Sequence, residues 1–95
     1  MGNKAKIAEL HVEILNTNGV EIRCELALRK LKMSKDKRFN VSVACYEFDT
    51  VTATDIPAEL LREAFEYLIK RCKEREQEYV RELNELLEQE IKRKC

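Results

Sequence analysis

The sequence predicts an α+β fold in two layers: a three-stranded antiparallel meander covered on one face by one long C-terminal helix, in the order β-β-β-α. Three runs in which apolar and polar residues alternate predict the strands, and a long run of helix formers without glycine predicts the helix. At 95 residues the chain is expected to form a single domain, residues 1–95, with the meander over 5–54 and the helix over 55–95.

The first two runs have apolar residues at even positions and mostly polar or charged residues between them, the period-2 pattern of a strand with one buried face. The apolar positions are Ala8, Leu10, Val12 and Ile14 in the first run and Val20, Ile22, Cys24, Leu26 and Leu28 in the second. A three-residue loop, Thr17-Asn18-Gly19, would pair Ile14 with Ile22 and keep every apolar side chain on one face. A two-residue Asn18-Gly19 turn would mix the faces, so the longer loop is expected.

The third run, FNVSVACYEFDTVTAT at 39–54, starts with apolar residues at odd positions. Tyr46 and Phe48 break this parity, which indicates a bulge or a bend near Cys45. A meander that is apolar on one face needs an element to cover that face, and the predicted helix follows directly.

The predicted helix starts in TDIPAELLREAF, with Asp55 as the N-cap and Pro57 in the first turn. Residues 56–94 are almost all good helix formers, and a continuous helix of this length would span about 58 Å at 1.5 Å per residue. A compact domain of this size has a diameter of roughly 33 Å. The first half of the helix is therefore expected to cover the sheet and the second half to project.

The projecting half carries apolar residues for which the meander offers no surface, so we expect them to form a homodimer interface about a two-fold axis. They are Tyr79, Val80, Leu83, Leu86, Leu87 and Ile91. Six polar residues, KEREQE at 73–78, interrupt the apolar positions and are interpreted as crossing the edge of the domain. Strict heptads are not found when Tyr79 and Leu86 are placed at a, because Glu82 or Gln89 then falls at a core position. The alternative is a break within KEREQE that folds the last helix back as a hairpin.

No catalytic, metal or cofactor site is predicted. Cys24, Cys45 and Cys72 lie on predicted apolar faces and are interpreted as core thiols, and Cys95 lies at the terminus. The cysteines form no C-x-x-C pair, and His11 is the only histidine. Without a phosphate loop or a catalytic motif, the chain is not expected to be an enzyme.

A basic cluster, RKLKMSKDKR at 29–38, is expected to form the loop that joins the second and third strands. Its basic residues are Arg29, Lys30, Lys32, Lys35, Lys37 and Arg38. A basic β-ribbon can follow phosphates, so nucleic acid is one possible partner of this loop. The other interpretation is a solvated loop that discourages aggregation at the sheet edge.

Tyr46 and Phe48 are interpreted either as a partner-binding patch on the open face of the sheet or, if the bulge turns them inward, as core residues. Together these features predict a small non-enzymatic homodimeric binding protein, a protein–protein adaptor or inhibitor of the kind that phages and mobile elements encode. The alternative function is a nucleic-acid-binding dimer that uses the loop at 29–38. No run of residues is long and apolar enough to span a membrane, and the N-terminus lacks a secretory signal, so a cytoplasmic location is expected.

Overall fold

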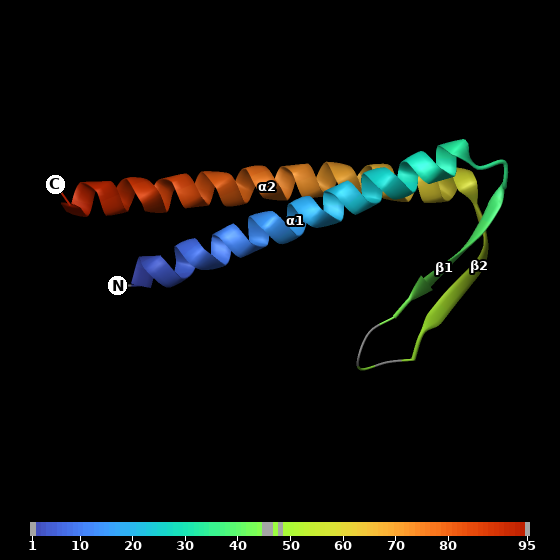
Figure 1. The fold of residues 1–95 in the computed structure, drawn as a ribbon, viewed down its shortest axis with the longest axis horizontal. Coiled ribbons are helices and arrows are strands. Elements are labelled where there is room, and N and C mark those ends of the chain that lie inside the picture. Colours follow the sequence, from blue (N-terminus) through green and yellow to red (C-terminus); the bar gives the residue numbers. More distant parts are fainter. Residues whose placement is uncertain (1, 45–46, 48, 95) are drawn as a thin grey trace.

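The computed structural model describes residues 2–44, 47 and 49–94, and within them two long antiparallel helices are joined by a β-hairpin (Figure 1). The elements are α1 (Gly2–Met33), β1 (Arg38–Val43), β2 (Val51–Pro57) and α2 (Ala58–Lys94). The prediction of a three-stranded meander over 5–54 with a covering helix is wrong. The described part of the chain has one two-stranded antiparallel sheet, and the residues of the first two predicted strands form α1. The expected long C-terminal helix is present as α2.

One side of α1 packs against α2 through residues spaced alternately four and three apart. These positions are all buried or half-buried: Asn3, Ile7, Leu10, Ile14, Thr17, Glu21, Cys24, Leu28 and Leu31. A 3-4 spacing keeps side chains on one side of a helix, as in coiled coils. The contact with α2 therefore runs along the whole of α1.

The opposing side of α2 is built in the same way. Its buried or half-buried positions are Leu61, Phe65, Ile69, Cys72, Glu76, Tyr79, Leu83, Leu86 and Glu90. The heptad spacing appears when Tyr79 is placed at d and not at a, because Glu76, Leu83 and Glu90 then fall at a. α2 is continuous through KEREQE, with no fold-back there, and Glu76 in that stretch takes a core position.

The period-2 pattern of α1 arises because this helix is apolar on two opposite sides. Two residues along a helix advance by about 200°, so residues two apart lie on nearly opposite sides. Leu10 is 2% exposed while Val12 is 53% exposed, and Cys24 is 7% exposed while Ile22 is 47% exposed. Because such a helix alternates like a strand, the predicted Thr17-Asn18-Gly19 loop lies inside α1.

The third predicted strand is a hairpin in the structure. β1 pairs with β2 in antiparallel register, and a bulge lies where Asn40 opposes two residues of β2, Thr54 and Asp55. Asp55 has a φ of 58°, donates its backbone N–H to Asn40 Oδ1 at 3.3 Å and accepts a bond from Arg38 Nη1 at 2.8 Å. Asp55 is therefore not the N-cap of α2, which begins three residues later at Ala58.

The hairpin extends away from one end of the helical pair. The start of α1 and the end of α2, where the chain begins and ends, lie at the other end (Figure 1). The molecule measures 60 × 30 × 14 Å, and its radius of gyration is 18.5 Å, whereas a compact domain of this length would have about 12 Å. The chain is thus a thin, elongated object with little interior. Five apolar residues are buried among the described residues: Leu10, Cys24, Leu61, Cys72 and Leu83.

Candidate interaction surfaces

The centre of the helical pair holds two thiols from opposite helices. Cys24 and Cys72 are both buried and both free. Burial raises the pKa of the Cys24 thiol, and the neighbouring Cys72 raises it further. A thiol with a raised pKa is a poor nucleophile, so the Cys24 thiol is not expected to be reactive. Both cysteines are buried and act as small apolar residues between α1 and α2.

Next to the thiols lies a contact between two carboxyl groups, Glu21 on α1 and Glu76 on α2. The Oε1 atom of each is buried without a hydrogen-bond partner. Burial raises the pKa of Glu76, and the neighbouring carboxyl group of Glu21 raises it further. Glu25 adds to this effect and Lys73 opposes it. This polar contact explains why the apolar spacing of α2 is interrupted at KEREQE.

The side of α1 that faces away from α2 is a second apolar surface, which we call the outer stripe. It has the same 3-4 spacing as the packed side for most of its length and consists of Ala8, Val12, Leu15, Gly19, Ile22, Leu26 and Met33. Leu15 is 70% exposed. None of these seven residues carries a charge, and Arg29 occupies the position of the same spacing between Leu26 and Met33. No element of the described chain covers the outer stripe. A helix with two apolar sides needs cover on both of them, and α2 covers only one side of α1.

The accessible surface of the chain is larger than its mass requires. It is 7976 Å², whereas a compact monomer of 11.2 kDa exposes about 5,700 Å². The difference is roughly 2,300 Å², which reaches the upper part of the area that each partner buries in an obligate dimer. The surface is thus large enough to support a stable interface.

The six residues predicted as a dimer interface on α2 are divided between two environments. Tyr79, Leu83 and Leu86 lie on the side of α2 that packs on α1. Val80, Leu87 and Ile91 are exposed. A salt bridge of 3.8 Å between Lys6 Nζ and Glu82 Oε1 joins the helices in the same region. Half of this set therefore contributes to the contact within the chain, and half faces outward.

A further apolar surface is one face of the β-hairpin. The register places three apolar pairs on this face, and we call it the hairpin face: Phe39 with Ile56, Val41 with Ala53, and Val43 with Val51. Val43 and Val51, nearest the tip, are 67% and 68% exposed. The opposite face carries polar residues, among them Ser42 and Thr52, whose hydroxyls are 3.0 Å apart. The hairpin is therefore amphipathic.

The basic cluster lies at the junction of the helices and the hairpin, not in a loop between strands. Arg29, Lys30 and Lys32 belong to the last turns of α1, where they are favourable at the negative end of the helix dipole. Within the described residues, none of the six cations forms a salt bridge. Four of them, Lys32, Lys35, Lys37 and Arg38, border a pocket of about 630 Å³ between the end of α1 and the start of α2.

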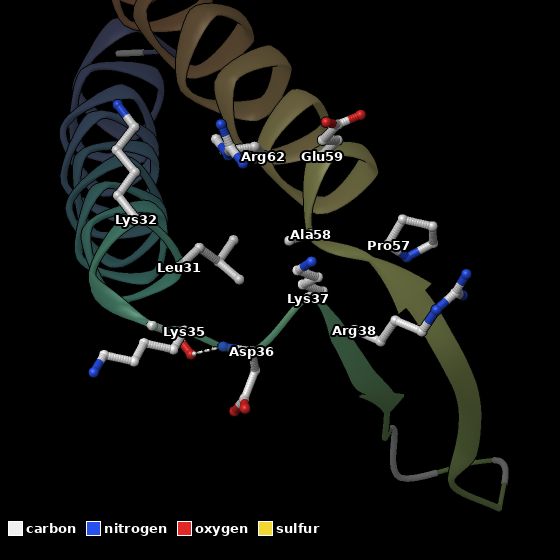
Figure 2. Close-up of a pocket in the computed structure, with 11 residues that line it drawn as sticks. Leu31, Lys32, Lys35, Asp36, Lys37, Arg38, Pro57, Ala58, Glu59 and Arg62 are labelled. Atoms are coloured by element: carbon white, nitrogen blue, oxygen red, sulfur yellow. Dashed lines mark hydrogen bonds between the residues drawn. The ribbon is translucent and has the colours of Figure 1, made fainter.

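Figure 2 shows how the side chains around this pocket are oriented. Leu31 points toward Ala58, and Lys37 lies below Ala58 at the opening. Lys35 and Arg38 point away from the pocket in opposite directions. The positive charge is therefore spread over the surface of this end and does not converge on one point.

Several predicted residues lie outside the part of the chain that the structure describes: the patch Tyr46 and Phe48, and the thiols Cys45 and Cys95. The outer stripe and the hairpin face were missed by the sequence interpretation. The signal for the outer stripe was present, because residues 2–33 contain no proline and carry two 3-4 patterns at once.

Among residues 2–44, 47 and 49–94, no three or more His, Cys, Asp or Glu residues are grouped closely enough to hold a metal ion. No helix in the same part of the chain has the length and apolar character needed to cross a membrane.

Comparisons of the chain with models of protein families, with curated proteins and with solved structures give no match.

Proposed function

We propose that the chain is a non-enzymatic homodimeric binding protein, an adaptor or inhibitor, in which the outer stripe of α1 packs on the same stripe of a second copy. The observation that carries this proposal is that α1 is apolar on two opposite sides while the chain covers only one of them. Packing two such stripes together would give a bundle of four helices with the two α1 helices in the middle.

The chemistry of the outer stripe suits contact with itself. In an isologous interface each residue lies near residues of the same surface on the partner, so like charges would repel. The stripe has none. Ala8 and Gly19 are small, and a Cβ built at Gly19 meets nothing within 4 Å in the single chain. Two α1 helices can therefore approach closely where Gly19 lies.

The test introduces charge into the outer stripe through the double variant Leu15→Glu, Ile22→Glu. Both positions are exposed in the single chain, so the monomer should keep its fold, while two unpaired carboxylates at a helix contact should raise the dimer dissociation constant at least about 100-fold. Sedimentation equilibrium with reductant measures the association, and circular dichroism checks the helix content.

The matched control is Gln77→Glu, Asn84→Glu, which adds the same charge at two exposed positions seven residues apart on α2. This control should dimerise like the unmodified chain. An unmodified chain that is monomeric at tens of micromolar would refute the proposal. If the control variant were monomeric and Leu15→Glu, Ile22→Glu still dimerised, the interface would lie on the outward side of α2, near Val80.

A second candidate function is nucleic-acid binding through the basic cluster, and the observation in its favour is that six cations gather at one end without internal salt bridges. Affinity for duplex DNA should then fall with salt with a slope of about −0.9 per phosphate contact. Lys35→Glu, Lys37→Glu should abolish this binding, and the same charge change at the other end, Lys4→Glu, Lys92→Glu, should not. No binding at low salt would eliminate this candidate.

The cytoplasmic location is also a proposal. It rests on the sequence features named above and on the chemistry of Cys24 and Cys72, since a pair of facing thiols stays reduced most readily in a reducing compartment.

A further inference from the structure

The contacts that the hairpin makes within the chain are too few to make it stable on its own. It has two strands, and a two-stranded hairpin is marginally stable in water unless its apolar face is covered. Toward the base, Phe39, Val41, Ile56 and Pro57 are half-buried, and β2 leads into α2 there. Toward the tip, the pair Val43 and Val51 is exposed to solvent.

We propose that the hairpin face packs on the hairpin face of a second copy, in a parallel dimer whose two-fold axis runs along the long dimension of the molecule. This inference rests on the proposed function, because it extends the interface formed by the outer stripe. The hairpin lies at one end of the molecule, and the start of α1 and the end of α2 lie at the other (Figure 1). A parallel dimer brings both hairpins to one end, whereas an antiparallel dimer would separate them along a molecule that is 60 Å long.

Two observations and one consequence of symmetry favour a second copy as the occupant of the hairpin face. The six residues of the face include no charged side chain, so contact with itself brings no repulsion. The excess surface of roughly 2,300 Å² is more than a standard-sized interface needs, about 800 Å² per partner, so two surfaces can be covered. A parallel arrangement buries the outer stripe and the hairpin face within one closed dimer, leaving no free site for further copies.

The first test compares two cross-strand pairs at the same end of the hairpin. Val43→Glu, Val51→Lys places an opposite-charge pair on the hairpin face, and Ser42→Glu, Thr52→Lys places the same pair on the polar face. Cross-strand opposite charges are tolerated within a hairpin, so both variants should fold. Sedimentation equilibrium should show a dimer dissociation constant raised at least about tenfold for the first variant and unchanged for the second.

The second test measures orientation by disulfide crosslinking of the full chain with Cys45 and Cys95 replaced by serine. In this background Val43→Cys should form a reducible dimer under mild oxidation, because the two faces meet, and Ser42→Cys should not. The helix content of each variant, from circular dichroism, confirms that the fold is kept.

The outcomes separate this inference from the proposed function. In one outcome, Leu15→Glu, Ile22→Glu abolishes the dimer, while the changes at Val43 and Val51 have no effect and Val43→Cys forms no crosslink. This outcome would overturn the parallel hairpin contact and leave the outer stripe as the interface. Equal effects of the two hairpin double variants would also overturn it. A monomeric unmodified chain would overturn both proposals.

Discussion

The two long helices differ in how their apolar residues are distributed. α2 carries its core residues on one side, flanked by a surface rich in charged residues, and it is clearly amphipathic. α1 carries apolar residues on the side that packs on α2 and again on the opposite side, so it has almost no net amphipathic character. The single chain therefore leaves a whole apolar side of α1 uncovered, whereas the exposed apolar residues of α2, such as Val80, Leu87 and Ile91, lie outside its dominant apolar side.

The largest expected effect compares the two sides of α1 directly. Leu10→Ala removes a side chain that is 2% exposed and should lower the free energy of unfolding by about 2–5 kcal/mol, because it leaves a cavity between the helices. Urea denaturation followed by circular dichroism measures this loss. The loss should be similar at low and high protein concentration, because it concerns contacts within one chain.

The matched change on the other side is Leu15→Ala. It should have little effect at protein concentrations where the chain is monomeric, and it should destabilise the chain only where the dimer forms. If Leu10→Ala and Leu15→Ala were equally destabilising in the monomer, the distinction between a packed and an unpacked side of α1 would be wrong.

A smaller effect is expected at Asp55, which tests the backbone strain in the bulge of the hairpin. Its φ of 58° is uncommon for a residue with a side chain and is strained for a β-branched one. Asp55→Val should therefore cost about 1–3 kcal/mol, measured by thermal or urea denaturation. Asp55→Gly relieves the backbone strain and serves as the control, which should stay within about 1 kcal/mol of the unmodified chain.

Gly19 provides a test in which the change should stabilise the protein. It lies inside α1 with an ordinary negative φ, and an added Cβ would meet nothing within 4 Å. Gly19→Ala should raise the free energy of unfolding of the monomer by about 0.5–1 kcal/mol, because alanine loses less conformational entropy in a helix. A loss of stability in the monomer would show that the outward side of α1 is covered within the chain.

The smallest effect concerns the contact between Glu21 on α1 and Glu76 on α2, where each helix contributes a carboxyl group. Burial and Glu21 raise the pKa of Glu76 in the folded chain, so the folded state binds this proton more tightly than the unfolded state does. This contribution to stability should therefore increase as pH falls through the raised pKa, and should be complete below about 4.3, the ordinary value for glutamate.

Denaturation of Glu76→Gln and of the unmodified chain at pH 7 and pH 5 measures this contribution as a difference, in which the other carboxyl groups largely cancel. The variant should be the more stable of the two at pH 7, and its advantage should shrink at pH 5. An advantage that grows toward pH 5 would show that the two carboxyl groups are not in contact.

The sequence predicted α2 and failed for α1, and the reason lies in the geometry of a helix. Residues 56–94 contain one proline, at the start, and one dominant apolar side, so period and composition agree there. In α1 the two apolar sides produce alternation, and Asn18-Gly19 falls where a turn would be expected. Only the 3-4 spacing from Ile7 to Leu31 distinguishes the helix from two strands.

The candidate surfaces were predictable to a lesser extent. The basic cluster was recognised, but its position depends on where α1 ends, which the strand interpretation placed wrongly. The interface residues on α2 were recognised as apolar residues that need a partner, and Leu83 is buried because α1 provides one. Most of the hairpin face has the odd parity of the third predicted run, but the bulge at Asp55 brings Ile56, an even position, onto the same face.

The hydrogen bond at the base of the hairpin, from the Ala58 N–H to the Lys37 carbonyl at 2.8 Å, has a consequence for the order in which the chain folds. Met33 and Ala58, where the helices end and begin, are far apart along the chain, but a hairpin between them needs only a short loop to be closed. Once the hairpin has formed, the end of α1 and the start of α2 are held together, and each further turn of helix adds contacts at little additional cost in chain entropy. The helical pair can thus assemble from the hairpin end outward, so that Leu10 and Leu83 meet last.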